Sequence, residues 1–197
     1  MVKTETADQL LWSQFKNGDK ESFSLIYQQN ITSLLNYGLR INDDTAILKD
    51  IIQDLFIELW NSRLNLCEVD SIKFYLFKAL RFKLIRLEKK QIASNKLSII
   101  LRESTNEKTD LSTEDKMIDE EAQENQRELL QKALMSISTR QKEAIQLRFY
   151  HGFTHEQIAE LMQLNYQSVS NLLYTAILRI REKLKAPALI NEYAFHR

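Results

Sequence analysis

The sequence predicts an all-α protein made of two small helical domains joined by a polar, acidic linker. Three observations support this fold class. The 197 residues include only 3 Gly and 1 Pro, too few for a turn-rich β architecture. Apolar residues recur at three- and four-residue steps in two long stretches, the spacing of helices that bury one face. Between these stretches the chain is rich in Ser, Thr, Asn, Asp and Glu, which is typical of a linker.

These changes in composition divide the chain into four segments. Residues 1–90 form an N-terminal domain, 91–128 a flexible acidic linker, 129–185 a C-terminal domain and 186–197 a tail. Within the linker, some helix is possible at 117–127. Neither a secretion signal nor an apolar stretch of membrane-spanning length is present, so we expect a cytoplasmic protein without membrane insertion.

Four helices account for the N-terminal domain, and the first two are marked by their ends. Thr6 and Gln9 make a capping box that opens the first helix, and Gly18 closes it. Asp19 caps the second helix, which we expect to end near Asn42. Both carry apolar residues at helical spacing, so both should pack against a common core.

The third and fourth helices follow acidic residues. The third comes after Asp43 and Asp44 and carries a wide apolar stripe that ends at Trp60. The fourth starts after Asp70 and continues to about Lys90. Its expected buried face consists of Ile72, Tyr75, Leu76, Ala79, Leu80, Leu84 and Leu87.

The C-terminal domain carries a helix-turn-helix pattern. Thr154 and Gln157 make a second capping box, Leu164 marks the turn, and Asn165 can cap the longer helix that follows. The apolar residues expected to pack inward are Val169, Leu172, Leu173, Ala176, Ile177, Ile180 and Leu184. The opposite face is polar and could address base edges, as a recognition helix does. Its candidate residues are Gln167, Ser168, Ser170, Asn171, Tyr174 and Thr175, with Arg179 directed to phosphates.

The charge is distributed in blocks although the formal net charge is zero. Residues 1–70 carry 6 Lys and Arg against 11 Asp and Glu, whereas 71–108 carry 10 against 3. Residues 109–128 carry 2 against 8, and 129–185 carry 8 against 4. Two basic blocks separated by an acidic one indicate two sites able to meet phosphate. Ordinary solvated helix faces are the alternative for either block alone.

Several segments resemble the sigma factors of bacterial RNA polymerase, and in particular the extracytoplasmic-function group. Residues 138–143 (STRQKE), 147–154 (LRFYHGFT) and 156–161 (EQIAEL) look like the first half of sigma region 4. Residues 164–174 (LNYQSVSNLLY) resemble its recognition helix, and 49–60 (KDIIQDLFIELW) look like region 2.2. A helix-turn-helix alone is weakly specific, but both motifs in this order across a polar linker are much more so. The resemblance implies a function in promoter recognition.

The region 2.2-like helix has a polar, partly acidic face opposite its apolar stripe. An acidic face suits a protein partner better than DNA, and the resemblance implies docking on the clamp helices of core RNA polymerase. An ordinary solvated face is the alternative. The candidate core-binding residues are Asp50, Gln53, Asp54, Ile57 and Asn61.

The fourth helix mixes basic and aromatic residues, a combination suited to phosphate neutralisation and to stacking on unpaired bases. The resemblance implies recognition and melting of the promoter −10 element here. The candidates are Lys73, Phe77, Lys78, Arg81, Lys83, Arg86, Lys89 and Lys90. Aromatic residues at helical spacing, such as Trp60, Phe74 and Phe77, can equally be core.

Two departures from the family pattern matter. In the −10 helix Phe82 and Arg86 stand where relatives commonly carry Asn and Asp, so those base contacts cannot be carried over. Family recognition helices often place Lys or Arg at the positions of Ser170, Leu172 and Thr175. The absence of these basic residues here predicts that the helix binds DNA weakly on its own and gains affinity when the chain is tethered to polymerase.

We therefore expect a sigma factor that directs RNA polymerase to promoters through −10 and −35 recognition and promoter melting. By family analogy, an anti-sigma factor should sequester it. We expect no covalent catalysis, no cofactor and no metal, since Cys67 stands alone without clustered ligands. The alternatives are a helix-turn-helix regulator that acts without core polymerase, a helical adaptor that binds only proteins, and, least supported, an enzyme.

Overall fold

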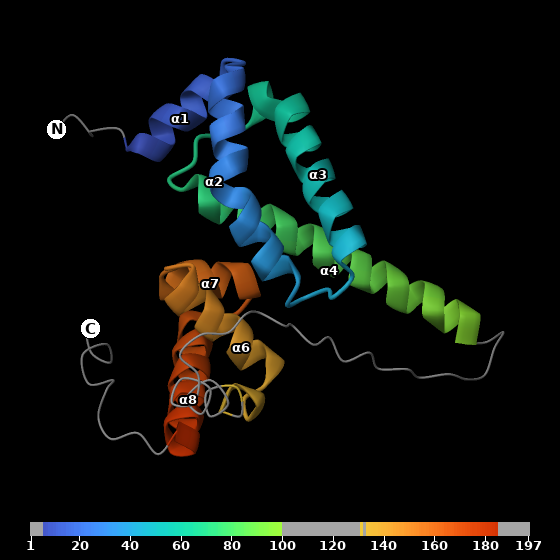
Figure 1. Ribbon diagram of the computed structural model, residues 1–197, viewed down its shortest axis with the longest axis vertical. Coiled ribbons are helices and arrows are strands. Elements are labelled where there is room, and N and C mark those ends of the chain that lie inside the picture. Colours follow the sequence, from blue (N-terminus) through green and yellow to red (C-terminus); the bar gives the residue numbers. More distant parts are fainter. Residues whose placement is uncertain (1–5, 100–130, 132, 185–197) are drawn as a thin grey trace, which may run out of the picture. The chain divides into compact units, whose positions relative to one another are not determined.

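The computed structural model describes residues 6–99, 131 and 133–184, and in the fourth helix it describes side chains as far as Lys89. The chain divides into two compact units, Met1–Thr105 and Asn106–Arg197. Every regular element among the described residues is helical (Figure 1), so the predicted all-α class is confirmed.

The first unit contains, in its described part, four α-helices and one short 3₁₀ turn. The helices α1 and α2 pack against each other, and α3 packs back on α2 (Figure 1). α4 crosses the unit and contacts both α2 and α3. The elements are α1 Ala7–Lys16, α2 Lys20–Gly38, α3 Thr45–Ser62, η1 Arg63–Asn65 and α4 Ile72–Ile99.

The helix starts of this unit follow the predicted capping residues. Thr6 and Gln9 form a reciprocal capping box at α1, and Asp19 accepts a hydrogen bond from the backbone of α2. The Asp44 carboxylate accepts bonds from two first-turn N–H groups of α3. Gly18 follows α1 with φ +92°, a backbone conformation that favours glycine. Short-range capping chemistry therefore determines where these helices begin.

The second helix ends earlier than expected, at Gly38 instead of near Asn42. A Cβ atom at Gly38 would lie 2.9 Å from Cδ2 of Leu48 on α3 and closer still to Cδ1, so the two helices approach closely at this point. The Asn42 side chain accepts a hydrogen bond of 2.9 Å from the Asp44 N–H and therefore belongs to the connection. The chain turns early because α3 packs back on α2.

Aromatic rings fill the core of the first unit. The Trp12 and Phe15 rings are fully buried, with centroids 5.2 Å apart. The Tyr37 and Phe77 rings, from α2 and α4, are also fully buried and lie 4.9 Å apart. Each large apolar side chain contributes about 1.5–3 kcal/mol when it is removed from water. The contact between Tyr37 and Phe77 joins α2 to α4, and the Trp12 ring, 5.2 Å from the Tyr75 ring, joins α1 to α4.

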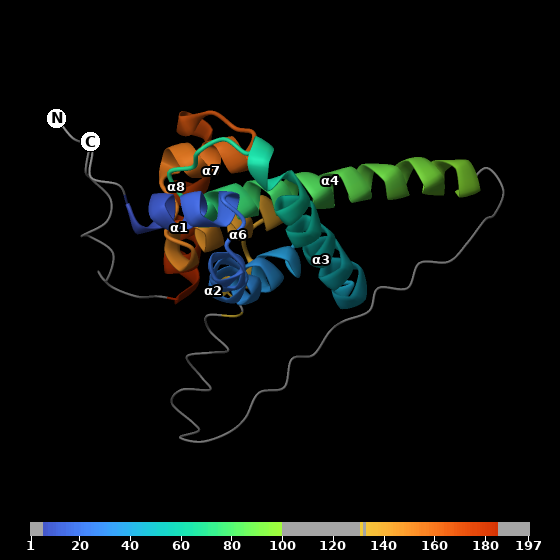
Figure 2. The same ribbon diagram turned by 90° about the horizontal axis from the view of Figure 1, so that it is seen from above.

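The fourth helix continues to Ile99, past the end expected near Lys90. In two perpendicular views its C-terminal part projects beyond the other helices of the unit (Figures 1 and 2). A projecting helix needs no continuous apolar stripe, which is why its sequence pattern fades. The first part of the expected linker is thus helical. The rest of it, with the possible helix at 117–127, and the tail at 186–197 lie outside the described residues.

The second unit is a helix-turn-helix in which α6 and α7 both contact α8. Thr154 and Gln157 form the predicted capping box at α7, and Asn165 accepts a bond of 2.7 Å from the Ser168 N–H at the start of α8. The elements are α6 Thr139–Ile145, the π-helical turn η2 Gln146–Tyr150, α7 His155–Met162 and α8 Tyr166–Leu184.

Candidate nucleic-acid and protein interfaces

The turn between α7 and α8 sets the direction of the second helix. Gln163 ends α7 in the left-handed region with φ 54°, which is uncommon for a residue other than glycine. Leu164, the residue predicted to mark the turn, follows it and is half-buried. Val169, Leu173 and Ala176 of α8 are buried. This packing leaves the opposite side of α8 at the surface.

The surface of α8 carries side-chain amides. Gln167 and Asn171 are exposed and one turn apart, and Gln167 Nε2 donates a hydrogen bond of 3.2 Å to Asn171 Oδ1. Tyr174 is 64% exposed, whereas Ser168 and Ser170 are half-buried. The exposed groups are hydrogen-bonding side chains of the kind that read base edges in a major groove.

Thr175 is exposed like its neighbours on α8, but its hydroxyl is engaged within the fold. The hydroxyl oxygen accepts a hydrogen bond of 2.9 Å from Gln141 Nε2 on α6 and donates one of 2.8 Å to the Asn171 carbonyl. These two bonds hold the Thr175 hydroxyl in place, so a contact from Thr175 to DNA stays a prediction. Arg179, further along α8, is exposed as expected.

His155 lies at the first position of α7, against the start of α8. Its ring centroid is 5.5 Å from that of Tyr166. Burial lowers the pKa of His155 from its ordinary value of 6.5, and the positive charge of Arg148 lowers it further, while Glu156 opposes the shift. The lowered pKa favours the neutral imidazole, which packs against the Tyr166 ring at the start of α8.

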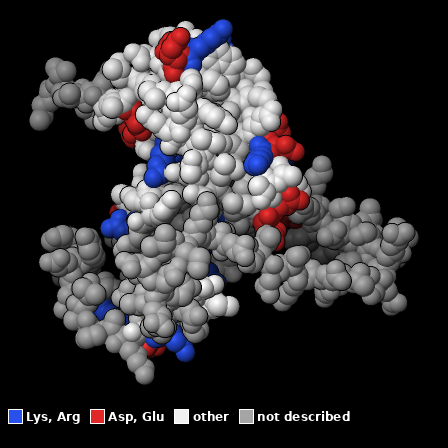
Figure 3. Space-filling model, viewed as in Figure 1, with Lys and Arg blue, Asp and Glu red and all other residues white. Residues whose placement is uncertain are grey.

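The polar face predicted on α3 lies at the surface of the first unit. All five candidates for a protein interface are exposed, and Ile57, the apolar one, is 49% exposed. In the view of Figure 3 the area over α2 and α3 is largely uncharged, with charged groups toward its edges. These exposed residues are Asp50, Gln53, Asp54, Ile57 and Asn61.

A groove of about 580 Å³ runs between α2 and α3 and joins this face. Three of the five candidates, Gln53, Ile57 and Asn61, line it. The other wall belongs to α2 and is apolar, a contribution that sequence reasoning missed. The apolar spacing of that helix is visible in the sequence, but it does not tell which apolar residues stay accessible. The α2 residues of the wall are Phe23, Tyr27, Ile31 and Leu35.

The basic candidates on α4 differ in their surroundings. Lys78, Arg86 and Lys89 are exposed, whereas Lys73, Arg81 and Lys83 are half-buried. Lys83 forms an ion pair of 2.6 Å with Glu58 of α3. Burial lowers the pKa of Lys73, whose ammonium nitrogen lies 6.0 Å from the centre of the Phe77 ring. The Lys90 side chain lies outside the described residues.

The aromatic candidate on α4 requires a correction. Phe77 is fully buried against Tyr37, so it belongs to the core. Phe82 is instead 65% exposed and is an aromatic ring of α4 that a base can reach. Helical spacing separates the two rings, because Phe77 shares a face with the buried Leu80 and Leu84 at three- and four-residue steps, whereas Phe82 falls on the opposite side.

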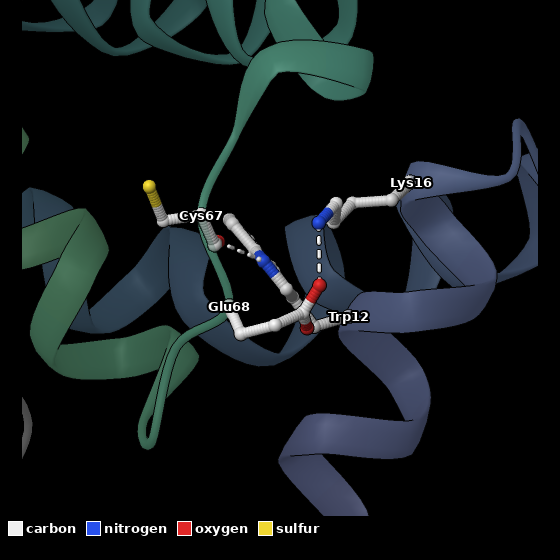
Figure 4. A network of polar contacts seen from close by, with 4 residues as sticks. All are labelled: Trp12, Lys16, Cys67 and Glu68. Carbon is white, nitrogen blue, oxygen red and sulfur yellow. Dashed lines mark hydrogen bonds and ion pairs between the residues drawn. The ribbon is translucent and has the colours of Figure 1, made fainter.

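A set of polar contacts from α1 holds the connection between α3 and α4 (Figure 4). The Trp12 indole N–H donates a hydrogen bond of 2.9 Å to the Cys67 carbonyl oxygen, and Lys16 pairs with Glu68. The Asp8 carboxylate accepts a bond of 2.9 Å from the Ile72 N–H at the first turn of α4. The start of the basic helix is thus positioned by α1, which sequence reasoning did not predict.

Within the described part of the chain, no three His, Cys, Asp or Glu residues come together as a metal site. The helices described there are also too short or too polar to cross a membrane.

The sequence matches the family model for sigma-70 region 4 over residues 127–180. The chain is 25% identical over 186 residues to the ECF RNA polymerase sigma factor SigK of Mycolicibacterium vanbaalenii, covering 92% of this chain and 90% of that protein. It is 22% identical over 165 residues to the RNA polymerase sigma factor YlaC of Bacillus subtilis, covering 84% and 93%.

Two solved structures share the fold. One is the sigma factor RpoE of Bartonella quintana in complex with the anti-sigma factor NepR, with a TM-score of 0.62 and 19% identity over 85% of this chain and 99% of that chain. The other is CnrH in complex with the cytosolic domain of CnrY, with a TM-score of 0.58 and 16% identity over 93% and 100%.

Proposed function

The chain belongs to the sigma-70 family of RNA polymerase sigma factors, in the extracytoplasmic-function group, and from this premise we propose which surfaces select promoters. It directs RNA polymerase to specific promoters and initiates DNA-templated transcription. The assignment of surfaces rests on two features that the chain holds in separate units. One is a helix with exposed side-chain amides, and the other is a largely apolar groove beside the exposed face of α3 that carries Asp50 and Asp54. A helix-turn-helix regulator acting without polymerase needs only the first.

The α2–α3 groove is the proposed docking site for the clamp helices of core polymerase. Tyr27 and Ile57 are large apolar residues at its walls, 41% and 49% exposed, and they gain burial when a partner covers them. Asp50 and Asp54 lie on the exposed face of α3 and supply charge complementarity, which mainly speeds association.

Helix α4 is the proposed −10 reader. Lys78, Arg86 and Lys89 are exposed and can neutralise phosphates, and the exposed Phe82 ring can stack on an unpaired base. Stacking of a base on an aromatic ring contributes about 1–3 kcal/mol. That is comparable to the roughly 1.4 kcal/mol of stacking lost per opened base-pair step, so captured bases can offset the cost of opening the duplex.

Helix α8 is the proposed −35 reader, with Gln167, Asn171 and Tyr174 in the major groove and Arg179 toward the phosphates. Without Lys or Arg on its first three turns, α8 gains little from phosphate contacts. We therefore propose that it acts only when polymerase tethers both units to one promoter.

We further propose that an anti-sigma factor sequesters this chain in the cytoplasm, since the sigma factor RpoE is solved in complex with the anti-sigma factor NepR. The chain itself would catalyse no covalent reaction, because sigma factors are generally not enzymes.

Run-off transcription tests the proposal. Core RNA polymerase of the source organism, freed of sigma factors, is incubated with a genomic DNA library with and without the full chain. Transcripts that begin at a shared motif only when the chain is present support the proposal. If the chain alone binds duplex DNA and no new transcripts appear, the helix-turn-helix regulator is supported instead. If the chain neither binds DNA nor starts transcripts, the adaptor that binds only proteins remains.

A further inference from the structure

We infer that α8 reads adenine, within A·T pairs, in the −35 element through the paired amides of Gln167 and Asn171, and that it makes no bidentate guanine contact. This inference rests on the proposed function and adds the class of DNA sequence that the site selects.

Cations are confined to the C-terminal part of α8. The commonest specific contact to guanine is a bidentate one from Arg or Lys to the two acceptors O6 and N7. No Lys or Arg occurs between Tyr166 and Leu178, and the first cation of α8 is Arg179. At 1.5 Å per residue, Arg179 lies about 12 Å further along the helix than Asn171. The N-terminal turns of α8, which enter the major groove in this arrangement, therefore carry no Lys or Arg that could make a bidentate contact to guanine.

The carboxamide groups of Gln167 and Asn171 each offer one hydrogen-bond acceptor and one NH₂ donor group. In each, the C=O accepts and the NH₂ donates from adjacent positions, which matches the N6–H₂ donor and N7 acceptor of adenine. Guanine presents two acceptors in the same place, so the amide C=O would face an acceptor and be left desolvated without a partner. A carboxamide in the groove thus discriminates against guanine at the contacted pair.

The two side chains are already joined to each other on the surface of α8. Gln167 Nε2 donates to Asn171 Oδ1 at 3.2 Å, and both side chains are exposed. This bond restricts the rotation of Asn171 before DNA arrives, so less side-chain entropy is lost on binding. The Oδ1 atom has a second lone pair, and the Nδ2 hydrogens are not used in this bond, so the donor and acceptor required by adenine remain.

The neighbouring residues fit the same class of base pair. Tyr174 follows Asn171 by three residues, on the same side of the helix, and is 64% exposed. Its ring offers an apolar surface to the C5-methyl group of thymine, which only an A·T pair presents in the major groove. The Thr175 hydroxyl, which could otherwise bond to any base, is held by Gln141.

The test uses holoenzyme assembled from the full chain and core polymerase, with a promoter library in which the −35 region is randomised and the −10 region is kept fixed. Each library member carries a transcribed barcode that identifies its −35 sequence, and the transcripts are sequenced after one round of initiation. The expected result is enrichment of A·T pairs at the contacted positions, with about a tenfold loss of transcripts when the contacted adenine is replaced by guanine. Enrichment of guanine, or no preference in the −35 region, would overturn the inference while leaving the sigma function intact.

Two substitutions of Asn171 test the contact directly. Asn171→Arg should shift the preference at one position from adenine to guanine, because the guanidinium supplies two donors. Asn171→Asp keeps the size of the side chain but lacks the donor, and it should lose the adenine preference. Core binding, measured in parallel, should stay unchanged for both. If the wild-type chain binds core polymerase yet starts no transcripts from any library member, the proposed function fails and the inference fails with it.

Discussion

Gln141 Nε2 donates a hydrogen bond of 2.9 Å to Thr175 Oγ1, which ties α6 to the surface helix α8. Gln141 is only 6% exposed, and its Oε1 atom accepts a bond of 3.0 Å from the Ser138 N–H in the capping box of α6. One side chain therefore completes a helix cap and positions a neighbouring helix. The Thr175 hydroxyl is a structural group on a face that otherwise carries candidate base contacts.

Thr175→Val should lower the free energy of unfolding of the second unit by about 1–2 kcal/mol, because it leaves the Gln141 amide buried without this acceptor. Chemical denaturation of the full chain measures the loss. Thr175→Ser keeps the hydroxyl and is the matched control. Equal stability of the two variants would show that the hydrogen bond does not contribute to stability. A changed −35 preference in Thr175→Val would show that the hydroxyl contacts DNA.

Gly38→Ala should destabilise the first unit by about 1–3 kcal/mol through overpacking. The added methyl group would lie 2.9 Å from Cδ2 of Leu48, a fully buried side chain, and closer still to Cδ1. Thermal and chemical unfolding measure the effect. Leu48→Val in the same chain should restore part of the lost stability by making room. A Gly38→Ala chain as stable as the wild type, consistent with the better helix propensity of alanine, would contradict the close contact.

Asp8→Ala should weaken the start of α4, because it removes the acceptor for the Ile72 N–H. We expect a loss of about 0.5–2 kcal/mol, as for a lost helix cap, and faster hydrogen exchange at the Ile72 amide. Promoter opening should fall while core binding is retained. Ser13→Ala, an exposed change on the same helix, is the control. Unchanged exchange at Ile72 would argue against this contact in solution.

Ile57→Asp should reduce the affinity for core polymerase tenfold or more, since it places a charge at the wall of the α2–α3 groove. Asp54→Ala should act mainly on the association rate, with an effect that shrinks as salt is added. Gln29→Ala, an exposed change on α2, is the control. Binding is measured by titrating labelled chain with core enzyme. Wild-type affinity in Ile57→Asp would exclude this groove as the docking site.

His155 should titrate below 6.5, because burial and Arg148 lower its pKa. The folded protein disfavours the protonated ring more than the unfolded chain does. The contribution of His155 to stability is therefore fully present above pH 6.5 and is lost as the pH falls through the pKa of the folded state. The NMR titration of its ring protons, assigned with His155→Gln, measures the value. A pKa at or above 6.5 would contradict the burial of this ring beside Arg148.

The local features of this fold were predictable because they are encoded within a few residues. The capping boxes at Thr6 and Thr154 lie where the sequence places them, as do the caps at Asp19 and Asn165. Helical periodicity also identified α3 and its polar face, which includes Asp50 and the other candidates for core binding. The two motifs and their order came from the resemblance of short segments to sigma regions 2.2 and 4.

The features that the sequence did not predict lie where one helix packs against another. Phe77 is buried against Tyr37 of α2; its spacing to Leu80 and Leu84 places it on the buried face of α4, but the spacing does not identify the ring that covers it. The Thr175 hydroxyl is engaged because Gln141 lies on a separate helix. The α2 wall of the groove and the contact between Asp8 and α4 likewise depend on packing between distant segments.

By itself, then, the sequence determined that the chain is helical, where most helices start, and that a helix-turn-helix follows another helical unit. Only the tertiary structure decided which polar and aromatic side chains remain accessible to a partner. The physical reason is that a cap or an apolar stripe is satisfied by atoms a few residues away, whereas exposure depends on every element packed against a side chain.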